Sequence, residues 1–430
     1  MILGDVPLWI VLIWLFTFGA VIGSFLNVCI YRLPQHEQLW AQLTGLTHPP
    51  SSCPYCKNRI LGRDNVPVLG WLMLRGRCRF CRHWIPPRYA LIEFFNGLLW
   101  VVLYLAIVPS GYSAKASDSL LWSSLGPLAN PALSRDQLIF LLHAQYFYYL
   151  VLAEALLVAT FIDFDLQIIP DGSTVPAMIV GVLGAWIIGH LHLWPVWFQS
   201  SSTLLNGTPT WMHWLLRGPD RPVWLMAHPH WHGLISSLAG IVVGGGVIWI
   251  LRIVGQWAWK REIMGFGDVI LMAMIGSFLG WQPTLLVFFV APFCGLIATV
   301  LSLQVFRARE IPYGPYLSLG ALLVLLAWRP YFSRFEIWFS LGPLILVVAV
   351  IMVALLAGSL MLFRRVKLLL GFPEFDDEWY EEEWSSGDQL AFFANKDLDS
   401  GSGPMKGAGW TGTAAGQGRL HVDRWRNGDR

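Results

Sequence analysis

The sequence predicts an all-α polytopic membrane protein with about nine transmembrane helices and a cytoplasmic zinc-binding loop. Of its 430 residues, 55% are hydrophobic and 13% are charged, whereas about a quarter of a soluble domain is charged. Nine apolar segments approach the roughly 20 residues that a helix needs to cross a bilayer. They cover 8–30, 89–108, 138–162, 174–194, 232–254, 266–281, 284–304, 314–328 and 335–363. The segments 266–281 and 314–328 are short, as tilted or broken helices would be.

Lysine and arginine predict the orientation, because cytoplasmic loops carry an excess of them. Four basic clusters lie between or after the apolar segments. They are the 34–88 loop, Arg252 with Lys260 and Arg261, Arg307 with Arg309, and Arg364 with Arg365 and Lys367. Nine spans and an external N-terminus place all four clusters, and the C-terminal tail, in the cytoplasm. A net charge of +2 without a long basic run gives no indication of nucleic-acid binding.

Four cysteines in the 34–88 loop have the spacing of a zinc site. Cys53 and Cys56 form one CxxC pair, and Cys78 and Cys81 form a second. Four thiolates complete a closed tetrahedron around zinc, which suits a structural ion and leaves no open position for catalysis. A redox pair and a metal-free loop are the alternatives, and His83 is an additional ligand that such a site does not need.

Three aspartates occur where the third apolar segment ends, in FIDFDLQIIPD (161–171). An ionisable group at the edge of a span is costly, so a functional role is the default hypothesis. Asp163 and Asp165 are separated by roughly 200° around a helix and cannot share a face. Asp171 follows Pro170, which disfavours helical geometry in the residue before it. Asp171 is well placed to cap the N-terminus of the next helix.

A fourth aspartate, Asp268, ends the motif GFGD at the start of the sixth segment. Gly265 and Gly267 allow other backbones to approach closely. Taken alone, Asp268 also fits a solvated helix N-terminus, which favours negative charge. The predicted topology, however, places Asp163 and Asp268 at the same membrane boundary. Such a pair can share a proton and activate water.

Six motifs together resemble those of a known family. In order, they are GSFLNVCIYRLP (23–34), the paired CxxC loop, RYALIE (88–93), FIDFDLQIIPD, GFGD and IPYGPYLSLG (311–320). Over residues 8–328 the chain resembles the type IV prepilin leader peptidases, which are intramembrane aspartic proteases of the GxGD class. The resemblance implies that Asp163 and Asp268 are catalytic. We expect Gly265, Gly267, Asp165 and Asp171, which lie in the same two motifs, to support the catalytic loop.

The resemblance further implies a bacterial inner-membrane enzyme whose partners are prepilins and pseudopilins. Such an enzyme removes a short basic leader on the cytoplasmic side. Many members then methylate the new N-terminus with S-adenosylmethionine, and the zinc loop and GSFLN segment are associated with that bifunctional form. Asn27, Glu93 and Gly97 are therefore candidates for methyl transfer or substrate binding. A polar helix-start residue and a packing glycine are the alternatives for Glu93 and Gly97. Ile270 stands where the family commonly has a lysine.

We expect five regions along the chain. They are a first transmembrane helix (1–33), the four-cysteine zinc loop (34–88), a protease core (89–328) with an external insert (195–231), an additional transmembrane helix (329–367), and a cytoplasmic tail (368–430). The tail begins with the acidic, aromatic stretch FPEFDDEWYEEEW (372–384) and becomes rich in glycine and serine. Such a composition is typical of disorder.

Two other functions remain open on the sequence alone. Paired aspartates also occur in proton-coupled transporters, and Ile270 is compatible with an inactive assembly subunit of a pilus or type II secretion system. A metal site at His228, His230 and His232 is a weaker hypothesis than an external surface loop. Glu154, within the third segment, is expected to be a polar partner or a buried protonated acid.

Overall fold

The structure is a computed structural model of the full chain. It describes residues 6–36, 38–47, 50–53, 55–108, 135–194, 206–216, 227–259, 264–305, 312–328 and 344–369, together with Val196, Trp224, Phe335 and Phe339. The expectations for the tail from residue 370 onward, and for most of the 195–231 insert, lie outside these residues.

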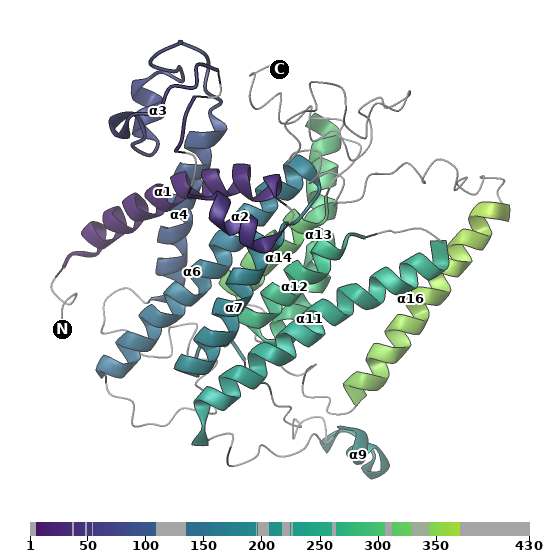
Figure 1. Ribbon diagram of the computed structural model, residues 1–430. Helices are drawn as coiled ribbons and strands as arrows, with labels where there is room; N and C mark the ends of the chain where they lie inside the picture. Colours follow the sequence, from purple (N-terminus) through teal and green to yellow (C-terminus); the bar gives the residue numbers. More distant parts are fainter. Residues whose placement is uncertain are drawn as a thin grey trace.

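The described residues form a bundle of helices (Figure 1). Each of the nine expected apolar segments overlaps a helix. These helices are α1 (Leu8–Arg32), α4 (Arg88–Ile107), α6 (Arg135–Leu166), α7 (Asp171–Ile188), α11 (Pro229–Trp259), α12 (Phe266–Leu279), α13 (Trp281–Val305), α14 (Gly314–Ala327) and α16 (Leu344–Leu369). Within the described ranges no strand forms, and two isolated β-bridges occur in the cysteine loop. The all-α fold class is therefore confirmed.

Seven of these helices are long and apolar enough to cross a membrane by length and composition. The two shorter apolar helices are α12 and α14, the same segments whose sequences are short for a span. Both contribute to the centre of the bundle, where Met272, Met274, Phe278 and Leu317 are fully buried. Because neighbouring helices surround α12 and α14, their short length does not leave backbone exposed to lipid.

Small residues allow the helices to pack closely. A Cβ on Gly276 of α12 would overlap the backbone of Gly240 on α11, and a Cβ on Gly240 would overlap Gly276 in return. Likewise, a Cβ on Gly97 of α4 would lie 2.8 Å from the carbonyl oxygen of Phe16 on α1. Such contacts provide the close van der Waals packing that holds helices together where lipid replaces water. By contrast, α16 lies at the edge of the bundle against α11, and its most apolar stretch is not buried.

Candidate functional site

Asp163 and Asp268 meet where three helix ends converge. Asp163 is in the last turn of α6, and Asp268 is in the first turn of α12. Asp163 is only 5% exposed. The two carboxyl groups lie close enough to repel each other when both are ionised. Residues separated by 105 positions in sequence are thus brought together, as the topology argument predicted.

The third helix end belongs to α14, which begins at Gly314. The backbone N–H of Gly314 donates a hydrogen bond to the Asp163 carboxylate. The first N–H groups of a helix have no partner within the helix, and the helix dipole favours a negative charge at this end. The preceding residue, Tyr313, is an electrostatic neighbour of Asp268. The start of α14 therefore binds Asp163 and lies near Asp268.

The glycines at this junction differ in what surrounds them. A Cβ on Gly314 would lie 3.2 Å from Asp163 Cγ and 3.2 Å from Ile169 Cδ1, and would overlap Asp163 Oδ2. A Cβ on Gly267 would lie 3.0 Å from Ile169 Cβ. For Gly265 the nearest atom is 3.9 Å away. The two glycines of GFGD are thus not equivalent, because only Gly267 is packed against the α6–α7 turn.

The α6–α7 turn places Asp163 at the end of its helix. Gln167 adopts φ +56°, and its N–H donates to the carbonyl oxygen of Asp163 at 2.9 Å. A residue with positive φ commonly ends a helix in this way. The next helix begins at Asp171 after the N-cap residue Pro170. The prediction that Asp171 caps α7 is therefore wrong, because Pro170 is the N-cap residue and Asp171 is the first helical residue. A negative charge in this first turn interacts favourably with the helix dipole.

Asp165 points to a different helix, as the 200° separation predicted. Its Oδ1 lies 2.7 Å from Nη1 of Arg88, the first residue of α4. The Arg88 guanidinium also lies over the ring of Phe161, 4.9 Å from its centroid. This ion pair joins the start of α4 to the end of α6. The cysteine loop, which precedes α4, and the aspartate pair consequently lie at the same end of the bundle.

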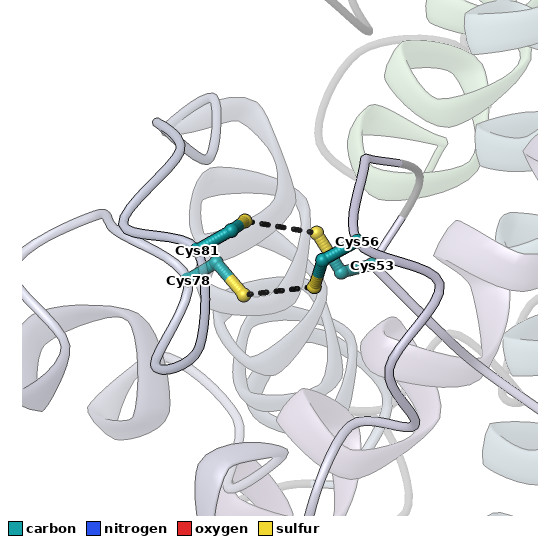
Figure 2. A group of neighbouring side chains, drawn as sticks. All are labelled: Cys53, Cys56, Cys78 and Cys81. Carbon is teal, nitrogen blue, oxygen red and sulfur yellow. Dashed lines mark hydrogen bonds between the residues drawn. The ribbon is translucent and has the colours of Figure 1, made fainter.

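The four loop cysteines form a compact cluster (Figure 2). Their Sγ atoms all lie within 4.8 Å of one another. Cys53 Sγ is 3.7 Å from Cys81 Sγ, and Cys56 Sγ is 4.0 Å from Cys78 Sγ. Tetrahedral zinc with Zn–S bonds of about 2.3 Å requires sulfur atoms about 3.8 Å apart. The cluster therefore fits a structural zinc ion, with all four ligands supplied by cysteine.

Each cysteine pair lies on a turn with the same hydrogen bonds. The N–H of Cys53 donates to Asn58 O, and the N–H of Cys78 donates to His83 O. The two pairs therefore approach the centre from equivalent knuckles. The His83 ring stacks on Tyr55, with centroids 3.3 Å apart, and His83 is not part of the four-cysteine group. Cys29 and Cys294 are buried in helices α1 and α13, away from this loop.

The methyl-transfer candidates all lie where α1, α4 and the loop meet. Glu93 Oε2 accepts a 2.7 Å hydrogen bond from the N–H of Val68, and the Glu93 side chain also bonds Ser24. Asn27 Nδ2 donates to Tyr89 O at 3.1 Å, and Gly97 is packed against α1. These groups bind other parts of the chain. They connect α1, α4 and the cysteine loop at this end of the molecule.

The three histidines near the start of α11 form hydrogen bonds with backbone groups. His228 and His230 donate through Nδ1 to the carbonyl oxygens of Trp224 and Trp186, and His232 Nε2 accepts from the N–H of Val196. Among the described residues, the cysteines alone form a cluster of three or more potential metal ligands. Glu154 is a polar partner, as expected, because its Oε1 accepts from Trp100 Nε1 and Asn96 Nδ2 at 2.5 and 3.0 Å.

Sequence reasoning gave no role to Gly314, Arg88 or Ile169. Gly314 lies in the motif IPYGPYLSLG and Arg88 in RYALIE, so both were present in motifs that carry the resemblance. Their contacts with Asp163 and Asp165 join residues 151 and 77 positions apart in sequence. Only packing in three dimensions shows such contacts.

Comparison with known proteins identifies the family of this chain. The bacterial peptidase A24 N-terminal domain matches residues 17–107, and the type IV leader peptidase family matches residues 223–300. A prepilin leader peptidase/N-methyltransferase of Klebsiella pneumoniae is 30% identical over 270 residues, covering 63% of this chain and 85% of the relative. The chain belongs to the type IV leader peptidase family.

Further relatives extend this match along the chain. The prepilin leader peptidase/N-methyltransferase of Aeromonas hydrophila is 28% identical over 350 residues, which cover 76% of this chain and 93% of the relative. A type 4 prepilin-like proteins leader peptide-processing enzyme of Escherichia coli O78:H11 is 29% identical over 71% of this chain and 89% of its own length. No solved structure matches. The resemblance inferred from the six motifs is confirmed, and the transporter and inactive-subunit alternatives gain no support.

Proposed function

We propose that this protein is an intramembrane aspartic endopeptidase that removes the basic leader of prepilins and pseudopilins. The observation that carries the proposal is the convergence of Asp163, Asp268 and the Gly314 N–H at one end of the bundle. Membership of a family whose relatives are named for prepilin processing supports the substrate class. The proposed location is the bacterial inner membrane.

The geometry suggests how the pair acts. Two neighbouring carboxyl groups cannot both ionise cheaply, so the pair retains one proton. The ionised aspartate takes a proton from water, and the resulting hydroxide attacks the scissile carbonyl carbon. The protonated aspartate donates to the carbonyl oxygen, and the pair later returns a proton to the leaving amine. The Gly314 N–H holds the Asp163 carboxyl group in place during these steps.

The location of the pair also suits a membrane-embedded substrate. Asp163 and Asp268 lie at helix ends rather than in the middle of their helices. An apolar substrate helix can lie in the bilayer while its cleavage point reaches this boundary. Because Asp165 is already paired with Arg88, Asp165 is not a free acceptor for the basic leader. We place this end of the bundle in the cytoplasm, with the N-terminus outside, on the basis of the basic clusters.

We also propose that the enzyme methylates the new N-terminus, with S-adenosylmethionine as the donor of the methyl group. The relatives that are named prepilin leader peptidase/N-methyltransferase support this activity. The candidate residues would contribute by holding α1, α4 and the cysteine loop together. Asn27 and Gly97 join α1 to α4, and Glu93 joins α4 to the loop. Structural zinc would hold the loop itself.

Co-expression with a prepilin tests both activities. The wild-type enzyme is expected to yield a shortened pilin whose N-terminal mass includes one methyl group. A pilin that keeps its leader would contradict the peptidase proposal. A shortened pilin without the methyl group would contradict the methyltransferase proposal alone, so the two outcomes are separable by intact-mass spectrometry.

A further inference from the structure

The cysteine loop exposes an apolar surface that its zinc-binding role does not explain. Helix α3 (Leu69–Met73) presents Leu69, Leu72 and Met73 to the outside, with exposed fractions of 57%, 54% and 73%. Their spacing of i, i+3 and i+4 places them on one face of the helix. We call these three residues the α3 face. An exposed apolar cluster of this kind marks an interaction site in a soluble part of a protein.

The opposite side of α3 is packed within the loop. Gly70 is buried, and a Cβ there would overlap the backbone of Asp64. Trp71 Nε1 donates to Ile85 O at 2.9 Å. These contacts fix the rotation of α3. The α3 face therefore points away from the loop because the loop has filled the other side, and the apolar side chains have no place inside it.

A hydrogen bond also holds the start of α3 close to the start of α4. Val68, the residue before α3, donates its N–H to Glu93 Oε2. Glu93 lies five residues inside α4, or about 7.5 Å along the helix axis. At that level Phe94 and Phe95 of α4 expose apolar rings. Figure 1 shows the loop with α3 at the end of the bundle where α4 begins. Helix α3 therefore begins close to the outermost turns of α4, which carry exposed apolar rings.

The positive charge of the loop indicates which kind of surface could bind the α3 face. Residues 51–88 contain eight basic side chains and one acidic side chain, Asp64. Asp64 is already paired with Arg79. Arg75, Arg77 and Arg82 are exposed, and none of them forms an ion pair with an acidic group in the described part of the chain. A loop that combines an exposed apolar face with exposed, unpaired positive charges is suited to a negatively charged lipid surface.

We propose that the cysteine loop docks on anionic phospholipid headgroups, with the α3 face inserted at the boundary between headgroups and acyl chains. Arg75, Arg77 and Arg82 contact the lipid phosphates, while Leu69, Leu72 and Met73 enter the apolar layer. A prepilin leader is a poor occupant of the same surface, because its basic charge would be repelled by these arginines. Docking supports the loop from the membrane side, in addition to the Glu93–Val68 bond. This proposal does not depend on the peptidase activity.

Spin labelling of the full-length protein tests the proposal. A label at Met73→Cys, the most exposed position of the α3 face, is placed in lipid nanodiscs of phosphatidylcholine alone or with added phosphatidylglycerol. With phosphatidylglycerol, the label is expected to be several-fold more accessible to oxygen, which concentrates in the bilayer, than to a water-soluble nickel reagent. The triple substitution Arg75→Gln, Arg77→Gln and Arg82→Gln is expected to abolish the effect of phosphatidylglycerol. Bound zinc, measured in every variant, shows that the loop is folded.

Two outcomes would overturn the proposal. One is a label that stays fully accessible to the nickel reagent in both kinds of nanodisc, which would place the α3 face in water. The other is a label that becomes protected only when a prepilin is added, which would make the α3 face a substrate surface. Leu69→Ser with Leu72→Ser in the labelled protein provides a second test. This change is expected to raise nickel accessibility at position 73 without reducing bound zinc.

Discussion

Substituting Gly314 by alanine should impair catalysis through one added methyl group. The new Cβ would lie 3.2 Å from Asp163 Cγ and overlap Asp163 Oδ2. Ile169 Cδ1, also 3.2 Å from the new Cβ, restricts its movement further. The carboxyl group must therefore move, and the Gly314 N–H can no longer hold it in the same position. A misplacement of about 1 Å at a catalytic group can lower the rate by about 100-fold.

This loss corresponds to about 2.7 kcal/mol of transition-state stabilisation. The assay is cleavage of a purified prepilin by the detergent-solubilised enzyme, with kcat and KM measured separately. We expect kcat to fall more than KM rises, because the new methyl group displaces the catalytic carboxyl group directly. A rise in KM at unchanged kcat would instead indicate that the substitution weakens substrate binding and leaves the carboxyl group in place.

A matched control is available on the same helix. A Cβ on Gly320 would lie 3.4 Å from its nearest neighbours, which are backbone atoms of α13. This is at the edge of ordinary van der Waals contact, so Gly320→Ala should change kcat by less than about threefold. Equal losses in both variants would show a general effect on α14 packing. Normal cleavage by Gly314→Ala would refute the proposed contact between α14 and Asp163.

Three further predictions concern the rest of the site. Gly267→Ala should reduce cleavage more than Gly265→Ala, because a Cβ is 3.0 Å from Ile169 at the first position and has no neighbour nearer than 3.9 Å at the second; equal kcat values would contradict this. Arg88→Gln and Asp165→Asn should each lower the unfolding temperature. The double variant should lose less free energy of unfolding than the two single variants lose together, by a coupling energy of about 0.5–3 kcal/mol; additive losses would argue against the ion pair. Cys53→Ser should abolish zinc binding and make the loop sensitive to trypsin while the helical core stays resistant, because a small metal site supplies the folding energy of its own loop; a metal-free loop that resists trypsin equally would refute this.

Sequence reasoning predicted the helices and the site because each rests on a local pattern. Apolar segments predicted all nine of these helices, and the short lengths of α12 and α14 were visible in their sequences. Loop charge placed Asp163 and Asp268 at one boundary, and they are neighbours in the structure. The spacing of the cysteines predicted a cluster that the Sγ distances fit.

What the sequence did not reveal depends on packing between distant segments. No local pattern shows that Gly314 meets Asp163 or that Arg88 meets Asp165, because helix rotation and tilt decide both contacts. The role of Asp171 was predicted wrongly for a related reason. Pro170 takes the N-cap position, so Asp171 is already helical. The hydrogen bonds by which Glu93 and Asn27 join α1, α4 and the cysteine loop are likewise not visible in any local pattern.

The central claim is that Asp163 and Asp268 act as one catalytic unit, and a double-mutant cycle on prepilin cleavage tests it most directly. Each of Asp163→Asn and Asp268→Asn should reduce cleavage to a residual rate while the protein remains inserted in the membrane. The double variant should show nearly the same residual rate, because groups that act as a unit are not additive. Full processing by either single variant, or independent losses that multiply in the double variant, would contradict the account.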